Sequence, residues 1–198
     1  MPARRIRAGA GFTAVELLLS VAVVVTVTGV AIPLTTSALD ELRAAMAARY
    51  VAGTIVGARL DALQRSARVG LRFEAAGSDY AFATYMDGNR NGVRTAEILD
   101  GTDPPLKPRA RLADHFGDVR FGLGAGVPDL DGARQLEEAD GVRIGTPRIL
   151  TLDPNGTATP GTLYIRGRRS QYAVRVLGAT ARTRIFRYHA GAHGWIAR

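Results

Sequence analysis

At 198 residues the chain is long enough for one modest globular domain and an accessory segment. It contains no cysteine, which excludes a disulfide framework and a thiolate metal site. The net charge of +8 is divided unevenly, because residues 1–11 carry +3, residues 12–142 carry −4 and residues 143–198 carry +9. This asymmetry indicates an anionic partner, or a neighbouring subunit that offers the opposite charge.

A short basic leader, residues 1–11, precedes an apolar run over residues 12–34 whose only charge is Glu16. As a helix, residues 12–33 would span about 33 Å, which is enough to cross a bilayer. A carboxylate in such a helix costs about 2.5–3.5 kcal/mol on insertion scales, so Glu16 requires an explanation. A cleaved secretory signal fits poorly, because the apolar run is too long and no small-x-small site follows it. A plain signal anchor fits the length and the basic flank but leaves Glu16 unexplained.

The stretch GFTAVELLLSVAVV, residues 11–24, closely resembles the class III signal of type IV pilins and type II secretion pseudopilins. Gly11, Phe12, Thr13 and Glu16 match its pattern of a leader ending in glycine, then Phe-Thr-x-x-Glu and about twenty apolar residues. The resemblance implies that a prepilin peptidase cleaves between Gly11 and Phe12 and methylates the new amine of Phe12. It also implies that Glu16 pairs with the terminal amine of an adjacent subunit, so that the charge fixes the register of a filament.

Residues 35–67 have the composition of a helix that continues the apolar one, and Pro33 is expected to kink this helix rather than to end it. Apolar residues recur there at spacings of mostly three or four, as in an amphipathic helix. We expect this apolar face to pack on a sheet; its members are Leu42, Met46, Tyr50, Ile55, Val56, Leu60 and Leu63.

From Val69 onward the pattern changes to that of short strands separated by Gly, Pro and Asp. Residues 99–145 are expected to be largely loop. The predicted architecture is α+β: a long N-terminal helix, transmembrane in its first half, packed on a C-terminal antiparallel β-domain of residues 68–198. The strands are predicted at residues 70–76, 79–86, 118–124, 148–153, 161–167, 171–177 and 183–189.

Two further stretches, residues 86–99 (MDGNRNGVRTAEIL) and residues 150–165 (LTLDPNGTATPGTLYI), resemble the GspH/FimT family of pilin-like proteins. The resemblance implies a minor pilin or pseudopilin, with a single span in the inner membrane and its C-terminal domain in the periplasm. It implies other pilins or pseudopilins as filament partners, besides the prepilin peptidase. Both a type II secretion pseudopilus and a type IV pilus use this architecture, and both alternatives stay open.

The Asp-x-Asn-x-Asn-Gly pattern that begins at Asp87 also opens an EF-hand calcium loop. In such a loop a bidentate acid belongs at the twelfth position, which is Ile98 here, while Glu97 falls one residue early. The favoured interpretation is a hairpin turn held by side-chain to backbone hydrogen bonds, with Gly92 at positive φ. The alternative is a calcium site with the candidate ligands Asp87, Asn89, Asn91 and Glu97.

No pattern in the chain indicates catalysis or a cofactor, and His189 and His193, four residues apart, lack an obvious third metal ligand. A second candidate function is DNA binding, because DNA-binding FimT-type pilins carry Gly-Arg-x-Arg near the C-terminus. The corresponding residues 181–184 read Ala-Arg-Thr-Arg, so Arg182 and Arg184 match and the glycine does not. Arg187 adds charge, and Tyr188 and Trp195 are candidates for stacking on bases. The alternative is a basic face that docks on acidic subunits.

Overall fold

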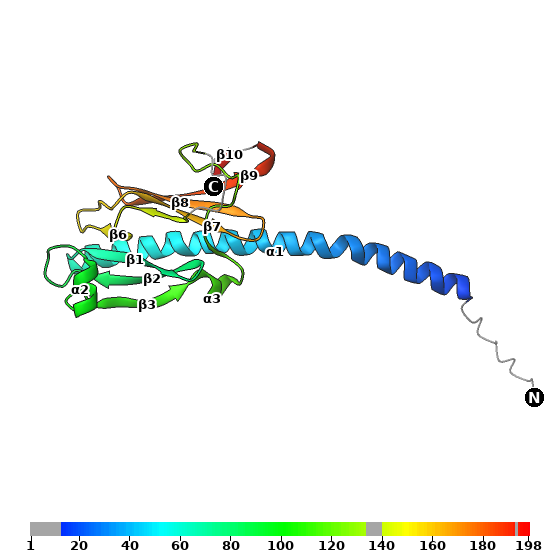
Figure 1. Cartoon of the computed structure of the whole chain (residues 1–198), viewed down its shortest axis with the longest axis horizontal. Coiled ribbons are helices and arrows are strands. Elements are labelled where there is room, and N and C mark those ends of the chain that lie inside the picture. The colour runs from blue at the N-terminus through cyan, green and yellow to red at the C-terminus, as the bar shows by residue number, and fades with distance from the viewer. Residues whose placement is uncertain (1–12, 134–139, 193) are drawn as a thin grey trace, which may run out of the picture. The chain divides into compact units, whose positions relative to one another are not determined.

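The computed structural model describes residues 13–133, 140–192 and 194–198 (Figure 1). It is a mixed structure of one long N-terminal helix and antiparallel sheets, so the predicted α+β class is confirmed. Two compact units divide the chain, one ending at Leu39 and the other running from Asp40 to Arg198. The leader, Gly11, Phe12 and His193 lie outside the described residues.

Helix α1 spans Ala14–Arg65 and does not stop at Pro33. Its first part is long and apolar enough to cross a membrane, by length and composition. Three hydroxyls in this part, those of Ser20, Thr26 and Thr35, donate hydrogen bonds to the carbonyl four residues earlier at 2.7–2.8 Å. These polar groups are therefore satisfied within the helix, as an apolar environment requires.

The second unit contains two sheets in which every strand pair is antiparallel. The first sheet has the order β3-β2-β1-β6, formed by β1 Val69–Ala76, β2 Asp79–Met86, β3 Pro105–Arg111 and β6 Ile149–Leu152. The second has the order β10-β9-β8-β7-β4, with β5 also paired to β7. Its strands are β4 Arg120–Phe121, β5 Val142–Ile144, β7 Gly161–Arg166, β8 Gln171–Leu177, β9 Arg182–His189 and β10 Gly194–Ala197.

The core of the second unit lies where the C-terminal part of α1 passes between the two sheets. Figure 1 shows this cyan part of the helix with β1, β2 and β3 on one side and β7 and β8 on the other. Leu71 and Phe73 of β1 and Leu163 and Ile165 of β7 belong to one buried cluster with the helix.

The face of α1 that packs in this core is not the one predicted. Of the seven expected contact residues only Ile55 is buried, and the other six are 38–52% exposed. The sheets contact mostly alanines, because a helix held between two sheets has room only for small side chains at a close approach. The buried helix residues are Ala44, Ala47, Ala48, Val51, Ala52, Ile55, Ala58 and Ala62.

The seven predicted strands are all present, but the segment expected to be loop contains more structure than predicted. Strands β3 and β5 and the short helices α2 (Thr95–Asp100) and α3 (Leu112–Phe116) were not predicted, nor were β10 and the single turn η1 (Ala190–Ala192). Strand β3 contains Pro105 and Pro108, which sequence patterns count against a strand. It forms all the same because it is an edge strand, where a missing N–H is tolerated.

Candidate functional site

Glu16 lies in the first turn of α1 and closes a capping box with Thr13. Its Oε2 accepts hydrogen bonds from the backbone N–H and the hydroxyl of Thr13, both at 3.0 Å, and the N–H of Glu16 donates to the Thr13 hydroxyl at 3.3 Å. This reciprocal pairing is the Thr-x-x-Glu signature of a helix N-terminus. The signature is visible in the sequence as Thr13 and Glu16, and it gives Glu16 a local role besides the proposed one in assembly.

The large apolar side chains of the first unit are exposed. Between Val15 and Leu34 those side chains are 52–74% accessible in the described part of the chain. A helix that is apolar on all sides needs a lipid environment or other helices around it. The first unit is therefore a surface that is completed by lipid or by another molecule.

A second exposed apolar surface lies on α1 within the second unit, and we call it the outward stripe. Its positions follow the strict four-three spacing of a coiled-coil seam. It comprises Leu42, Met46, Arg49, Gly53, Val56, Leu60 and Leu63.

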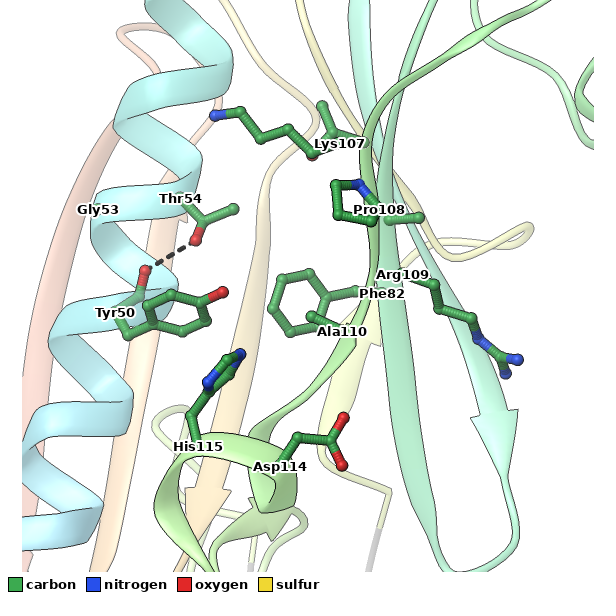
Figure 2. Close-up of a pocket in the computed structure, with 12 residues that line it drawn as sticks. Tyr50, Gly53, Thr54, Phe82, Lys107, Pro108, Arg109, Ala110, Asp114 and His115 are labelled. Carbon is green, nitrogen blue, oxygen red and sulfur yellow. Dashed lines mark hydrogen bonds between the residues drawn. The ribbon is translucent and has the colours of Figure 1, made fainter.

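A hollow of about 710 Å³ opens beside the middle of the outward stripe, between α1 and β3. Figure 2 shows the rings of Tyr50, Phe82 and His115 gathered in it, with Lys107 at one end and Arg109 pointing away. The ring centroids of Tyr50 lie 6.3 Å from Phe82 and 5.4 Å from His115. The hollow is thus an aromatic recess that adjoins an apolar helix face.

The three arginines proposed to bind DNA do not share one environment. Arg182 and Arg184 are exposed, and neither forms an ion pair within the described residues. Arg187 instead pairs with Glu41 of α1, at 2.9 Å between Nε and Oε1, and Glu41 also accepts a hydrogen bond from the Tyr172 hydroxyl. Arg187 therefore ties β9 to the helix, which the sequence did not reveal.

The register of the second sheet brings further arginines beside Arg184. Arg184 lies directly opposite Arg175, and Arg175 lies opposite Thr162, which in turn faces Arg143. Because side chains on one strand alternate between faces, these residues share the face turned away from the core. Carboxylates already neutralise two of them: Arg143 contacts Asp129 at 2.7 Å, and Arg175 contacts Asp131 at 2.7 Å.

The two aromatic residues proposed to stack on bases are partly buried and contact other groups of the protein. Trp195 and Tyr188 form an edge-on pair with centroids 5.5 Å apart. The Trp195 indole N–H donates to the carbonyl of Pro128 at 2.8 Å, and the ring packs on Tyr164. These contacts fix the orientation of both rings at the edge of the second sheet.

The Asp87 loop has the hydrogen bonds of a turn. The Asp87 carboxylate accepts from the backbone N–H groups of Asn89, Arg90 and Gly92 at 2.6–3.3 Å, and Gly92 has a φ of 99°. Asn91 donates through its side-chain amide to Glu97 at 2.6 Å. Within the described residues no group of three His, Asp or Glu side chains is placed to hold a metal ion.

A second carboxylate, Asp103, supports this loop and was not singled out in the sequence. It is fully buried and accepts from the N–H groups of Gly88 at 3.0 Å and Arg94 at 2.9 Å. Two acids therefore fix the loop from within, and their oxygens point at backbone rather than at a common centre.

Comparisons with known proteins add no family: no protein-family model, no curated protein and no solved structure matches the chain.

Proposed function

We propose that the chain is a minor pilin or pseudopilin, a structural subunit of a type II secretion pseudopilus or type IV pilus that acts in filament initiation and protein secretion. In this proposal prepilin peptidase removes residues 1–11, the first part of α1 holds the subunit in the inner membrane, and the β-domain lies in the periplasm. The helix then moves from lipid into the filament, where helices of other subunits cover it.

The observation that carries the proposal is the exposed apolar helix with a single carboxylate at its beginning. The side chains between Val15 and Leu34 have no cover in the described chain, and Glu16 is the only charge among them. An isolated charge among apolar helices favours the one arrangement in which it finds a counter-charge, so it selects a register. The long helix of α1 packed by its C-terminal part between antiparallel sheets supports the same proposal.

The test separates the two roles of Glu16. Glu16→Gln keeps an oxygen that accepts the capping hydrogen bonds but removes the charge, whereas Glu16→Ala removes both. If the charge sets the register, both variants are inserted and lose residues 1–11, as intact mass shows, and both enter filaments at least ten-fold less than wild type. Ser20→Ala is the matched control, because the Ser20 hydroxyl donates to the Glu16 carbonyl of its own helix. If the Glu16→Gln variant assembles normally, Glu16 acts only as a capping residue, and the proposed pairing of its charge with the terminal amine of another subunit is wrong.

A second candidate function is DNA binding during uptake by a retractable pilus. The observation that favours it is the exposure of Arg182 and Arg184 on the outer face of β9, without an ion pair within the described residues. These two residues are also the ones that match the family's arginines. The basic site would consist of Arg182 and Arg184 but not Arg187, which Glu41 already holds.

A further inference from the structure

The outward stripe has features of a binding surface. Six large apolar side chains of α1 lie 38–52% exposed in the second unit: Leu42, Met46, Val56, Leu60 and Leu63 of the stripe, and Tyr50 beside it. Five exposed leucine, methionine or valine residues in one line exceed the scattered apolar residues of an ordinary surface. The narrow four-three seam matches a partner helix better than a membrane surface, which selects a wider apolar face.

The exposed charged residues of α1 in this unit all have one sign. Arg49 lies within the stripe, Arg43 lies beside it next to Leu42, and Arg65 lies near the end of the helix, off the line of the stripe. The acids of the same stretch are engaged within the unit: the carboxylate of Asp40 by the turn after β7, Glu41 by Arg187, and Asp61 by Lys107 at 3.5 Å. A second copy would therefore bring arginines to this face and no free carboxylate, whereas an acidic helix would neutralise them.

A gap in the stripe lies at Gly53, next to the aromatic recess. Gly53 is exposed, and a Cβ added there would meet nothing within 4 Å. The recess of Tyr50, Phe82 and His115 opens beside this gap (Figure 2). A side chain of a helix that lies along the stripe can enter at this point, as a knob enters a hole in a coiled coil.

From the seam, the arginines and the recess, we propose that the outward stripe binds an acidic amphipathic helix of a different protein, with one apolar side chain of that helix in the recess at Gly53. The inference rests on the proposed function, because a filament would bring the helices of several different subunits next to this stripe. It specifies the chemistry of the neighbour: apolar at four-three spacing, acidic at the flanking positions, and not a second copy of this chain.

The experiment uses the full chain in nanodiscs of neutral lipid and a fluorescent synthetic helix. The probe has Leu at the seam positions and Glu at the flanks, and the matched peptide has Lys in place of every Glu; like charges keep each peptide from pairing with itself. We expect fluorescence anisotropy to show at least ten-fold tighter binding of the acidic peptide. Equal affinity for both peptides, or no binding of either, would overturn the proposal.

Variants locate the binding. Leu60→Glu places a like charge in the seam, and Gly53→Leu fills the gap, where an added Cβ meets nothing within 4 Å, so each should weaken binding of the acidic peptide at least ten-fold. Leu99→Glu is the control, because Leu99 is 75% exposed on α2, outside the stripe, and should leave the affinity unchanged. If Leu60→Glu and Gly53→Leu bind like wild type, the stripe is not the site.

Two other occupants are tested with Met46→Cys, which gives the only thiol in the chain. A covalent dimer on oxidation in native membranes would show that a second copy covers the stripe, and quenching of a fluorophore on this cysteine by brominated lipid would show that the bilayer does. We expect neither, and either one would overturn the proposal. None of these measurements requires a filament, so their failure is distinct from failure of Glu16 in assembly.

Discussion

Asp40 joins the helix to the second sheet through hydrogen bonds. Its carboxylate accepts hydrogen bonds from the backbone N–H groups of Arg168, Arg169 and Ser170 at 2.7–3.0 Å and from the Ser170 hydroxyl at 2.7 Å. Gly167 completes the contact, since a Cβ there would lie 2.4 Å from an Asp40 oxygen. One acid thus satisfies a whole turn between β7 and β8, which ordinary turn residues would leave to water.

The neighbouring residue, Glu41, makes the second connection of the helix to this sheet. It accepts from the Tyr172 hydroxyl and pairs with Arg187. Burial, together with the hydrogen bond to Glu41, raises the pKa of Tyr172 to about 12. The Tyr172 hydroxyl is therefore protonated at neutral pH and donates its hydrogen bond to Glu41. The dipeptide Asp40-Glu41 consequently positions α1 against β8 and β9 by polar contacts, while the alanines do so by packing.

Asp40→Asn should destabilise the second unit by about 2–4 kcal/mol at neutral pH, because hydrogen bonds to a charged acceptor are lost or weakened in a buried position. Burial raises the pKa of Asp40, but the hydrogen bonds from Arg169, Ser170 and Arg168 outweigh it and hold the pKa below its ordinary value. A lowered pKa stabilises the folded state above the pKa of the unfolded chain, about 3.9, and this contribution is lost as the pH falls through the folded pKa.

Thermal melting of the full chain in detergent at pH 7 and near pH 3 measures this effect, and the difference between wild type and Asp40→Asn should shrink at the lower pH. The control is Asp118→Asn, since Asp118 contacts Arg168 at 2.9 Å in an exposed pair and should contribute less than about 1 kcal/mol. An equal loss in both variants would show that Asp40 is an ordinary surface acid.

At the scale of elements, periodicity predicted the existence of the helix and most strands but not which helix face is buried. The pattern of Leu42, Met46, Leu60 and Leu63 predicts a core face because large apolar residues usually stabilise a core most. Here the helix lies between two sheets, and the available width selects alanine instead. Packing of this kind depends on the separation of the sheets, which a single sequence does not give.

The candidate sites were predictable to the extent that they are local in sequence. Thr13 and Glu16 are three residues apart, and the Asp87 turn closes within six residues, so their patterns are readable. Asp103 accepts hydrogen bonds from backbone N–H groups 9 and 15 residues away in the sequence. Asp40 accepts from backbone N–H groups about 130 residues away. No spacing rule in the sequence indicates either contact. The aromatic recess likewise combines α1, β2, β3 and α3, which only the fold brings together.

The loop between β2 and β3 should be stable without calcium. The carboxylate oxygens of Asp87 and Asp103 accept hydrogen bonds from five backbone N–H groups between residues 88 and 94. A bound calcium ion would have to replace these hydrogen bonds. We expect equal melting temperatures in millimolar calcium and in chelator. Asp103→Ala should cost about 2–4 kcal/mol, because it leaves buried donors unpaired, whereas Glu97→Gln retains an acceptor for Asn91 and should change little. A rise of the melting temperature with calcium, lost in Glu97→Gln, would identify a metal site.

At the scale of the whole molecule, the charge asymmetry of the sequence is partly balanced within the fold. In the part of the chain that the structure describes, arginines of residues 143–198 pair with carboxylates that precede residue 143 in the chain. Proximity in space thus reduces the contrast in charge that the sequence shows. The arginines that still favour an anionic partner are Arg182 and Arg184, which are exposed and form no ion pair within the described residues. The pairs are Arg143–Asp129, Arg148–Asp140, Arg168–Asp118, Arg175–Asp131 and Arg187–Glu41.

If the chain binds DNA, Arg182 and Arg184 should supply the phosphate contacts. Binding would be weak, tolerant of sequence and strongly dependent on salt, since log K falls by about 0.9 per phosphate neutralised for each log unit of salt. Replacing both arginines by Gln should weaken binding and reduce this slope by about 1.8, without loss of stability because both side chains are exposed. Arg187→Gln is the matched control: it breaks the pair with Glu41, so it should lower the melting temperature and leave the slope unchanged.

The affinity and its salt slope are measured by fluorescence anisotropy of a labelled duplex. The duplex is titrated with the full chain in nanodiscs of neutral lipid at several salt concentrations. A slope that responds to Arg187→Gln and not to the double variant would place the site elsewhere, and no binding by wild type at low salt would leave this basic face to contacts between subunits.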